Sequence, residues 1–222
     1  CYFENCKRNI RGASDSNIPF AVFKVTGISR FEILEKANNS KVELSESEKD
    51  ELRLVVDRID QICNAAYSNN LPLFIDAEET WIQDFIDRTA RIMMAKYNGA
   101  RAIIYNTVQM YRHDRLTFLN SEIDLAKKSN YFLGIKLVRG AYMEKERDRA
   151  LRLEYDSPIQ KNKEDCDNDF NSALELMMKN IENVAICAGT HNEKSSIMLT
   201  ELIEKSTLEK SDHRICFAQL LG

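Results

Sequence analysis

The sequence predicts an α/β fold built on a parallel sheet, and we interpret it as an incomplete (β/α)8 barrel. Six short apolar runs are each separated from the next by a stretch with helical periodicity. The runs are continuous rather than alternating with polar residues, as expected for strands that are buried on both faces. Polar residues follow nearly every run, and the carboxyl ends of the strands are where such barrels carry their active sites.

The first half of the chain contains three of these strands. Residues 1–18 are polar and are predicted to be irregular, and residues 36–45 are predicted to form a loop. Ser45 with Glu48 forms a capping box that starts a helix, and Asn98-Gly99 ends the next one, where glycine suits a left-handed cap. The predicted strands are 20–26, 71–77 and 102–107, and the predicted helices are 45–69 and 79–97.

The second half repeats the pattern. The predicted strands are 132–138, 184–188 and 214–218, and the predicted helices are 114–129, 143–153, one around Phe170 to Met177 and one around Ile197 to Ile203. We assign residues 1–18 to a polar N-terminal segment and 19–222 to the partial barrel domain. A doubly wound open sheet also fits the alternation, although no GxGxxG or Walker motif is present. Six strands instead of eight suggest a barrel that lacks one strand at each end.

Composition excludes several classes of protein. With 222 residues, 44% apolar content and a net charge of −4, the chain has one large core and no basic footprint for nucleic acid. No apolar run approaches the ~20 residues that span a bilayer. Six cysteines include no CxxC pair, so we expect no zinc site, reduced thiols and a reducing compartment. Cys63, Cys187 and Cys216 are interpreted as small buried apolar residues. Because the chain starts at Cys1, we expect a fragment of a longer protein.

The strand at residues 132–138 passes into an unusual polar sequence. Lys136 and Arg139 lie beside apolar residues, where an unpaired buried cation would be costly. Since side chains alternate along a strand, Lys136, Val138 and Gly140 are predicted to share one side, with Lys136 directed into the barrel mouth. Arg139 could contact a phosphate or pair with an acid outside the strand. The sequence therefore predicts a site for negative charge at this strand end.

Three further polar residues follow strands, and each has two interpretations. Lys24 either reaches solvent along its flexible stem or binds an anionic substrate group. Asp76 is interpreted as the N-cap of the next helix, which does not exclude a site role such as pairing with Lys24. His191, between Thr190 and Asn192 at a helix start, is either a satisfied capping residue or a phosphate contact. No nucleophile or metal-spaced histidine pair accompanies them, which suits a large anionic cofactor that performs the chemistry.

Five blocks of sequence resemble, in order and spacing, the proline dehydrogenase family. The most specific is Lys-Leu-Val-Arg-Gly-Ala-Tyr at 136–142. The others are Phe-Ile-Asp-Ala-Glu-Glu (74–79), Tyr-Asn-Thr-Val-Gln (105–109), Thr-His-Asn (190–192) and Phe-Ala-Gln-Leu-Leu-Gly (217–222). The resemblance covers about residues 18–222. Lys136, where bacterial relatives usually carry arginine, makes the chain similar to the eukaryotic, mitochondrial branch.

The resemblance implies a flavoenzyme on a distorted (β/α)8 barrel. FAD would accept a hydride from L-proline to give 1-pyrroline-5-carboxylate, the first step of proline catabolism, and a quinone would take the electrons. It also implies a mitochondrial location, in the matrix or in peripheral association with the inner membrane. No metal and no nucleic acid are implied.

The resemblance carries residue roles with it. Lys24 matches a lysine near the substrate carboxylate, Asp76 matches an aspartate beside substrate and flavin, and Tyr142 matches a tyrosine over the substrate pocket. The residues that match cofactor contacts are Gln109, Lys136, Val138, Gly140, Ala141, Thr190 and His191. Of these, Lys136 would lie near the reactive edge of the flavin.

One part of the family pattern is absent. A last strand with its own tyrosine and a last helix with paired arginines, which grip the proline carboxylate, would follow residue 222. Because a bidentate arginine clamp is a main source of substrate orientation, we expect this fragment alone to bind proline poorly and to turn over negligibly. Two alternatives stay open: the hydroxyproline dehydrogenase paralogue, which shares these motifs, and a truncated barrel without catalysis.

Overall fold

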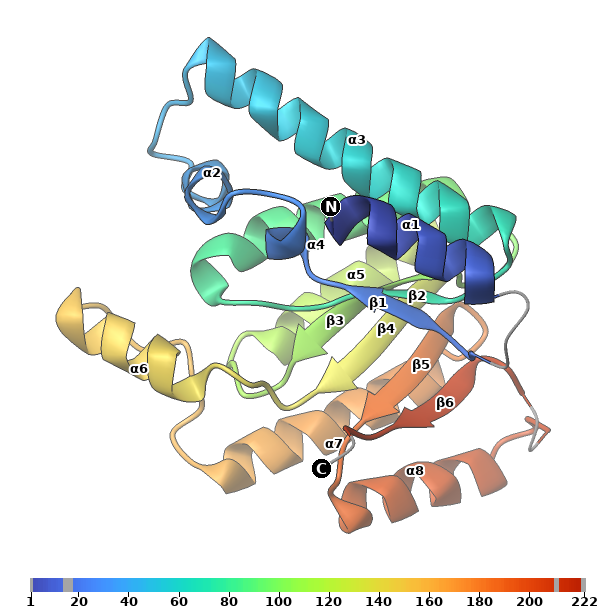
Figure 1. The fold of residues 1–222 in the computed structure, drawn as a ribbon. Helices are drawn as coiled ribbons and strands as arrows, with labels where there is room; N and C mark the ends of the chain where they lie inside the picture. Colours follow the sequence, from blue (N-terminus) through green and yellow to red (C-terminus); the bar gives the residue numbers. More distant parts are fainter. Residues whose placement is uncertain (1, 14–17, 210–211, 221–222) are drawn as a thin grey trace. The chain divides into compact units, whose positions relative to one another are not determined.

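The computed structural model describes residues 2–13, 18–209 and 212–220 (Figure 1). These residues fall into two compact units, the first ending at Asn106 and the second beginning at Thr107. Strand β3 (Ile104–Gln109) carries the chain from the first unit into the second. Cys1 and the last two residues of the 217–222 block lie outside the described part of the chain.

The first unit contains a short parallel sheet with helices between its strands. Strand β1 pairs in parallel with β2, and β2 pairs in parallel with the start of β3. Phe23, Phe74 and Ile82 are among its fully buried side chains. Before β3, its elements are α1 (Tyr2–Ala13), β1 (Ala21–Phe23), the 3-10 helix η1 (Val25–Gly27), α2 (Phe31–Asn38), α3 (Glu46–Ser68), β2 (Leu73–Ile75) and α4 (Thr80–Tyr97).

Two helices of this unit were not predicted. Residues 2–13 form α1 instead of the irregular segment expected for 1–18, and α1 packs against α3. Its polar composition concealed an amphipathic helix whose Ile10 is only 1% exposed. Helix α2 begins before the loop predicted at 36–45, and it buries Ile33 and Leu34. The loop itself begins only after Asn38.

The two predicted helix boundaries had different outcomes. The capping box is present, since Ser45 Oγ accepts from the Glu48 amide at 3.3 Å and Glu48 accepts from the Ser45 amide at 2.9 Å. The prediction of a left-handed conformation at Gly99 was wrong, because the φ angle of this residue is not positive. Instead the buried Asn98 accepts from the amides of Ile103 and Ile104 and donates to the Ile104 carbonyl, which ties the end of α4 to β3.

The second unit holds the rest of the strands and helices. Strand β4 pairs in parallel with β5, and β5 pairs in parallel with β6. Helices α5 and α7 pack against this sheet, and α8 packs against α7 (Figure 1). Its elements after β3 are α5 (Arg115–Ser129), β4 (Leu133–Val138), α6 (Met143–Arg152), α7 (Lys163–Lys179), β5 (Val184–Gly189), α8 (Glu193–Glu204) and β6 (Ile215–Ala218).

The strand order decides between the two predicted architectures. Within each unit, every strand lies beside its neighbours in sequence, in the orders β1-β2-β3 and β3-β4-β5-β6. A doubly wound sheet contains a point at which the strand order reverses. Neither unit has such a reversal, so the doubly wound alternative was wrong and the sequential order of a barrel remains.

Asp114 organises the charge at the start of α5. Its carboxylate accepts from Arg112 Nη2 at 2.7 Å and from Arg115 Nη2 at 2.5 Å, and both arginines are buried. Burial alone would raise the pKa of Asp114, but the hydrogen bonds from the two arginines lower it from 3.8 to about 2. The ionised carboxylate therefore stabilises the folded state above pH ~4, and this contribution is lost as the pH falls toward ~2.

We predict that Asp114→Asn lowers the free energy of unfolding by about 1–2 kcal/mol at pH 7, a range already reduced for the 40% exposure of this side chain. Urea denaturation at pH 7 and pH 3 would measure the difference, which should shrink at the lower pH. The matched control is Asp124→Asn, at an exposed position of α5, which should leave stability unchanged. An equal loss at both pH values would contradict the proposed role of the carboxylate charge.

Candidate active site

In the first unit, the predicted residues Lys24 and Asp76 are brought together. Lys24 Nζ lies 3.7 Å from Asp76 Oδ2, and the Asp76 amide donates to the Phe23 carbonyl at 3.0 Å. These residues directly follow β1 and β2, so the parallel pairing places their side chains at one sheet edge. Asp76 does not cap α4, whose N-cap residue is Glu79. The N-cap interpretation was therefore wrong, and the pairing of Asp76 with Lys24 is present.

Glu78 was missed by the sequence analysis and fixes the segment after Lys24. Its carboxylate accepts from the Thr26 amide at 3.1 Å and from the Thr26 hydroxyl. The side chain is only 3% exposed, and burial raises its pKa against the effect of the Thr26 hydrogen bonds. The signal available in the sequence was the second acid after the strand, in Asp-Ala-Glu-Glu. Glu78 thus holds η1, which begins directly after Lys24.

In the second unit, Val138 packs directly against the backbone of Gly189, on the sheet face that also carries Lys136. A Cβ at Gly189 would lie 2.9 Å from Val138 Cγ1 and 3.9 Å from Lys136 Cε. Lys136 and Val138 are half-buried, whereas Leu137 between them is fully buried on the opposite face. The predicted alternation along β4 is confirmed for these residues. The arrangement places the Lys136 side chain and the close contact of Val138 with Gly189 on one face of the sheet.

Gly140 is fixed by a backbone conformation and by a ring. Its φ is +129°, and a Cβ there would lie 2.6 Å from the ring of Tyr111. Tyr111 is held in turn by its amide, which donates to the Arg139 carbonyl at 2.7 Å. Its hydroxyl is buried without a well-formed hydrogen bond, and burial raises its pKa, an effect that the nearby Tyr142 backbone opposes. Only glycine fits this combination of φ and close approach.

Arg139 pairs with an acid, which resolves its two interpretations. Its Nε donates to Asp167 at 2.6 Å, and its guanidinium lies 4.3 Å from the Phe170 ring centroid. The other nitrogens donate to Thr190 Oγ1 at 2.6 Å and to Ser195 Oγ at 3.0 Å. The residue therefore joins β4 to α7 and to the turn between β5 and α8.

The turn at Thr190-His191-Asn192 is held largely by internal hydrogen bonds. Thr190 is 8% exposed, its hydroxyl accepts from Arg139 and from the Asn192 amide, and its own amide donates to Ala218. Asn192 caps α8 by accepting from the Ser195 amide at 3.2 Å. His191 is exposed between them. Of this turn, the His191 side chain is therefore the part that is presented to solvent.

The remaining predicted residues lie around the same strand ends. Gln109 ends β3 and is 3% exposed. Ala141 is exposed, and Tyr142 is half-buried at the N-cap position of α6 with Lys145 Nζ 5.7 Å from its ring centroid. The second unit thus gathers Gln109, Lys136, Val138, Gly140, Ala141, Tyr142, Thr190 and His191 at the carboxyl ends of β3, β4 and β5.

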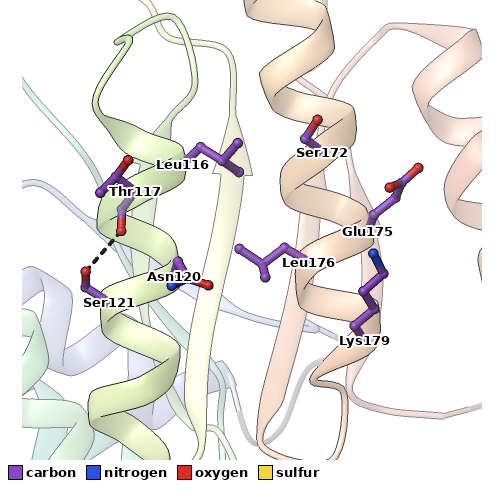
Figure 2. Close-up of a pocket in the computed structure, with 8 residues that line it drawn as sticks. All are labelled: Leu116, Thr117, Asn120, Ser121, Ser172, Glu175, Leu176 and Lys179. Carbon is purple, nitrogen blue, oxygen red and sulfur yellow. Dashed lines mark hydrogen bonds between the residues drawn. The ribbon is translucent and has the colours of Figure 1, made fainter.

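A surface pocket lies elsewhere in this unit. Figure 2 shows it between α5 and α7, with polar side chains along both helices. It is lined by Leu116, Thr117, Asn120, Ser121, Ser172, Glu175, Leu176 and Lys179. None of these is a predicted site residue, so this pocket is separate from the strand ends described above.

Comparison with known proteins decides the family. The family model for proline dehydrogenase matches residues 2–222. The chain belongs to this family. The match begins within α1, earlier than the resemblance at about residue 18.

Curated relatives agree with this assignment. Proline dehydrogenase 1, mitochondrial, of Drosophila melanogaster is 32% identical over 185 residues, covering 79% of this chain and 27% of the relative. Hydroxyproline dehydrogenase of Xenopus laevis is 31% identical over 183 residues, covering 81% of this chain and 39% of the relative. The chain therefore spans between a quarter and two fifths of the length of these members of the proline dehydrogenase family.

Solved structures confirm the fold class. Proline utilization A from Bdellovibrio bacteriovorus has a TM-score of 0.83 at 15% identity, covering 99% of this chain and 24% of that one. Its counterpart from Bradyrhizobium japonicum has a TM-score of 0.79 at 19% identity, covering 99% and 22%. The fold of this proline dehydrogenase family member is part of a distorted (β/α)8 barrel, as predicted.

We predict that Gly140→Ala destabilises the protein by about 2–3 kcal/mol, because alanine disfavours the positive φ and its Cβ would overlap the Tyr111 ring. Thermal and urea unfolding would measure the loss. The matched control is Gly99→Ala, where a Cβ meets no atom within 4 Å and φ is not positive. The explanation fails if both substitutions have the same effect.

Proposed function

We propose that this chain is part of an FAD-dependent proline dehydrogenase, which oxidises L-proline to 1-pyrroline-5-carboxylate and passes electrons to a quinone. The observation that carries the proposal is the block at 136–142, which sits at the end of β4 in a member of the proline dehydrogenase family. Relatives from Drosophila, human and Arabidopsis are named proline dehydrogenases. Oxidation of proline is therefore the reaction most consistent with this site.

The residues present fit a flavin nucleotide. Gly140 and Gly189 carry no side chain, and the Tyr111 ring and Val138 pack directly against their backbones, which keeps these strand ends compact. Lys136 supplies positive charge and His191 an exposed side chain at the carboxyl ends of β4 and β5, which suits an anionic pyrophosphate. The residues proposed to hold the cofactor are Gln109, Lys136, Val138, Gly140, Ala141, Thr190 and His191. When bound, FAD supplies the acceptor for the hydride that leaves proline.

The two proposed side chains of the first unit would bind and orient the substrate. Lys24 is 46% exposed although it pairs with Asp76, so its ammonium can take a second anionic partner, the carboxylate of proline. Asp76 holds that ammonium at the strand edge, and Glu78 fixes the segment that follows it. We propose that Tyr142 covers the substrate. None of these roles requires a metal, and none is proposed.

Location and acceptor rest on the relatives. Those of Drosophila, human and Arabidopsis are named mitochondrial, and we propose the same compartment for this protein, in the matrix or at the inner membrane. No helix that the structure describes is long and apolar enough to cross a bilayer. Peripheral membrane association and a quinone acceptor are parts of the proposal that follow from the family resemblance.

The alternative substrate is 4-hydroxyproline. The Xenopus hydroxyproline dehydrogenase matches at 31% identity and the Drosophila proline dehydrogenase at 32%, so identity does not separate the two. Both substrates carry the same carboxylate and ring amine, and they differ by one hydroxyl. Only protein groups near the ring carbon that bears the hydroxyl can distinguish the two substrates. An experiment therefore has to decide between proline and 4-hydroxyproline.

We predict that the natural full-length protein is purified with a flavin absorption spectrum, and that L-proline bleaches it anaerobically. Proline and 4-hydroxyproline should be titrated separately into the same preparation. Stronger bleaching by proline supports the proposal, and bleaching by 4-hydroxyproline alone assigns the protein to the paralogue. A folded protein without flavin would overturn the enzymatic proposal and favour the truncated, non-catalytic barrel.

Lys24→Met should raise the proline concentration for half-maximal bleaching about 10- to 100-fold, because a charge-assisted hydrogen bond of about 1.5–3 kcal/mol is lost. The flavin spectrum before proline is added should not change. The matched control is Lys41→Met, since Lys41 is an exposed lysine in the loop after α2. If Lys24→Met and Lys41→Met titrate alike, Lys24 does not bind the substrate carboxylate.

A further inference from the structure

Two cysteines meet on the sheet face that carries Lys136. We propose that Cys187 and Cys216 form a peroxide-sensitive dithiol, in which Cys216 is oxidised first and Cys187 then closes a disulfide. The pair lies within the second unit, and both thiols are free. The inference rests on the sheet register and on burial, and it does not require the proposed function to be correct.

The register of the sheet places these thiols side by side. Cys187 on β5 is directly opposite Cys216 on β6, and Lys136 on β4 is directly opposite Cys187. Residues opposite each other in a parallel sheet project from the same face, so the three side chains form one row. Neighbouring strands lie about 4.8 Å apart. Disulfides form across Cα separations of roughly 4.4–6.8 Å, so the backbone allows the bond.

The two thiols have different environments. Cys187 is fully buried, whereas Cys216 is only half-buried, which corrects the expectation that both are enclosed apolar residues. A hydrogen bond with Cys216 raises the pKa of Cys187, and the same bond lowers the pKa of Cys216 although burial opposes it. The thiolate is the nucleophilic form of cysteine. In this chain Cys216 is thus the more exposed thiol of the pair and the one more readily ionised.

The proposed chemistry consumes one hydroperoxide. The Cys216 thiolate attacks one peroxide oxygen, the O–O bond breaks, and the leaving oxygen takes a proton to become water or an alcohol. The Cys187 sulfur then attacks the resulting sulfenic acid, the S–S bond forms, and the sulfenic oxygen leaves as water with the Cys187 proton. Two thiols together lose two electrons and two protons, and the peroxide gains both.

Other cysteines that the structure describes lack this combination. Cys63 and Cys166 are buried, and burial raises the pKa of both thiols. Cys6 is half-buried beside Tyr2, and burial raises its pKa as well. Selective oxidation at Cys216 is therefore a specific expectation rather than a general property of the thiols.

The experiment uses the natural full-length protein, reduced and then exposed to a small excess of hydrogen peroxide. Free thiols are alkylated, and peptides are analysed by mass spectrometry without reduction. We expect a peptide cross-link between Cys187 and Cys216 that disappears on treatment with dithiothreitol. Oxidation of Cys6 or Cys166 before this pair, or oxidation of Cys216 to the sulfinic acid without a cross-link, would overturn the proposal.

Two variants test the order of events. In Cys187→Ser, a sulfenic acid at Cys216 has no partner thiol, so labelling of Cys216 by dimedone should rise about tenfold over the wild type. In Cys216→Ser, neither a cross-link nor a label at Cys187 is expected. Cys166→Ser is the matched control and should leave the cross-link intact. Because the wild-type measurement alone can refute the pair, the test does not depend on the folding of any variant.

Discussion

The candidate site of the second unit depends most on the contacts that the Arg139 guanidinium makes with its neighbours. A cation at the end of a buried strand is costly unless each of its donors finds a partner. Asp167 neutralises the charge, Thr190 and Ser195 accept two further hydrogen bonds, and the Phe170 ring covers one face. These contacts offset the free-energy cost of burying the Arg139 charge. They also fix α7 and the start of α8 relative to β4.

These contacts of Arg139 explain how neighbouring residues of the 136–142 block can face different surroundings. The donors of Arg139 bind other residues of the protein, whereas Lys136 projects from the other face of the strand toward Gly189. Gly140 follows at once with a positive φ, and the Tyr111 ring occupies the space where a side chain would otherwise lie. Glu78 has the comparable task in the first unit, where it fixes the segment after Lys24.

Sequence reasoning was most successful where a single local pattern has a single physical cause. Continuous apolar runs identified the strands, and the Ser45–Glu48 spacing identified a helix start, because each depends on residues near in sequence. It was wrong where partners are distant or composition is misleading. Polar α1 is held by packing on α3, and Asn98 ends α4 through bonds to residues five and six positions later. Neither leaves a clear signature in a short window.

The same limit applies to the candidate site: the sequence indicates which residue types are present, but not which partners they bind. The sequence identified the polar residues at strand ends, but only the packing separates those that are tied internally from those that are exposed. Thr190 and Glu78 are buried in hydrogen bonds, whereas Lys24 and His191 retain exposed side chains. A buried polar side chain with several hydrogen bonds positions its neighbours, whereas an exposed side chain can meet a ligand directly. The division therefore makes Arg139 a supporting residue in the second unit and Glu78 one in the first. We propose that the ligand contacts come from the more exposed side chains, Lys24 in the first unit and Lys136 and His191 in the second.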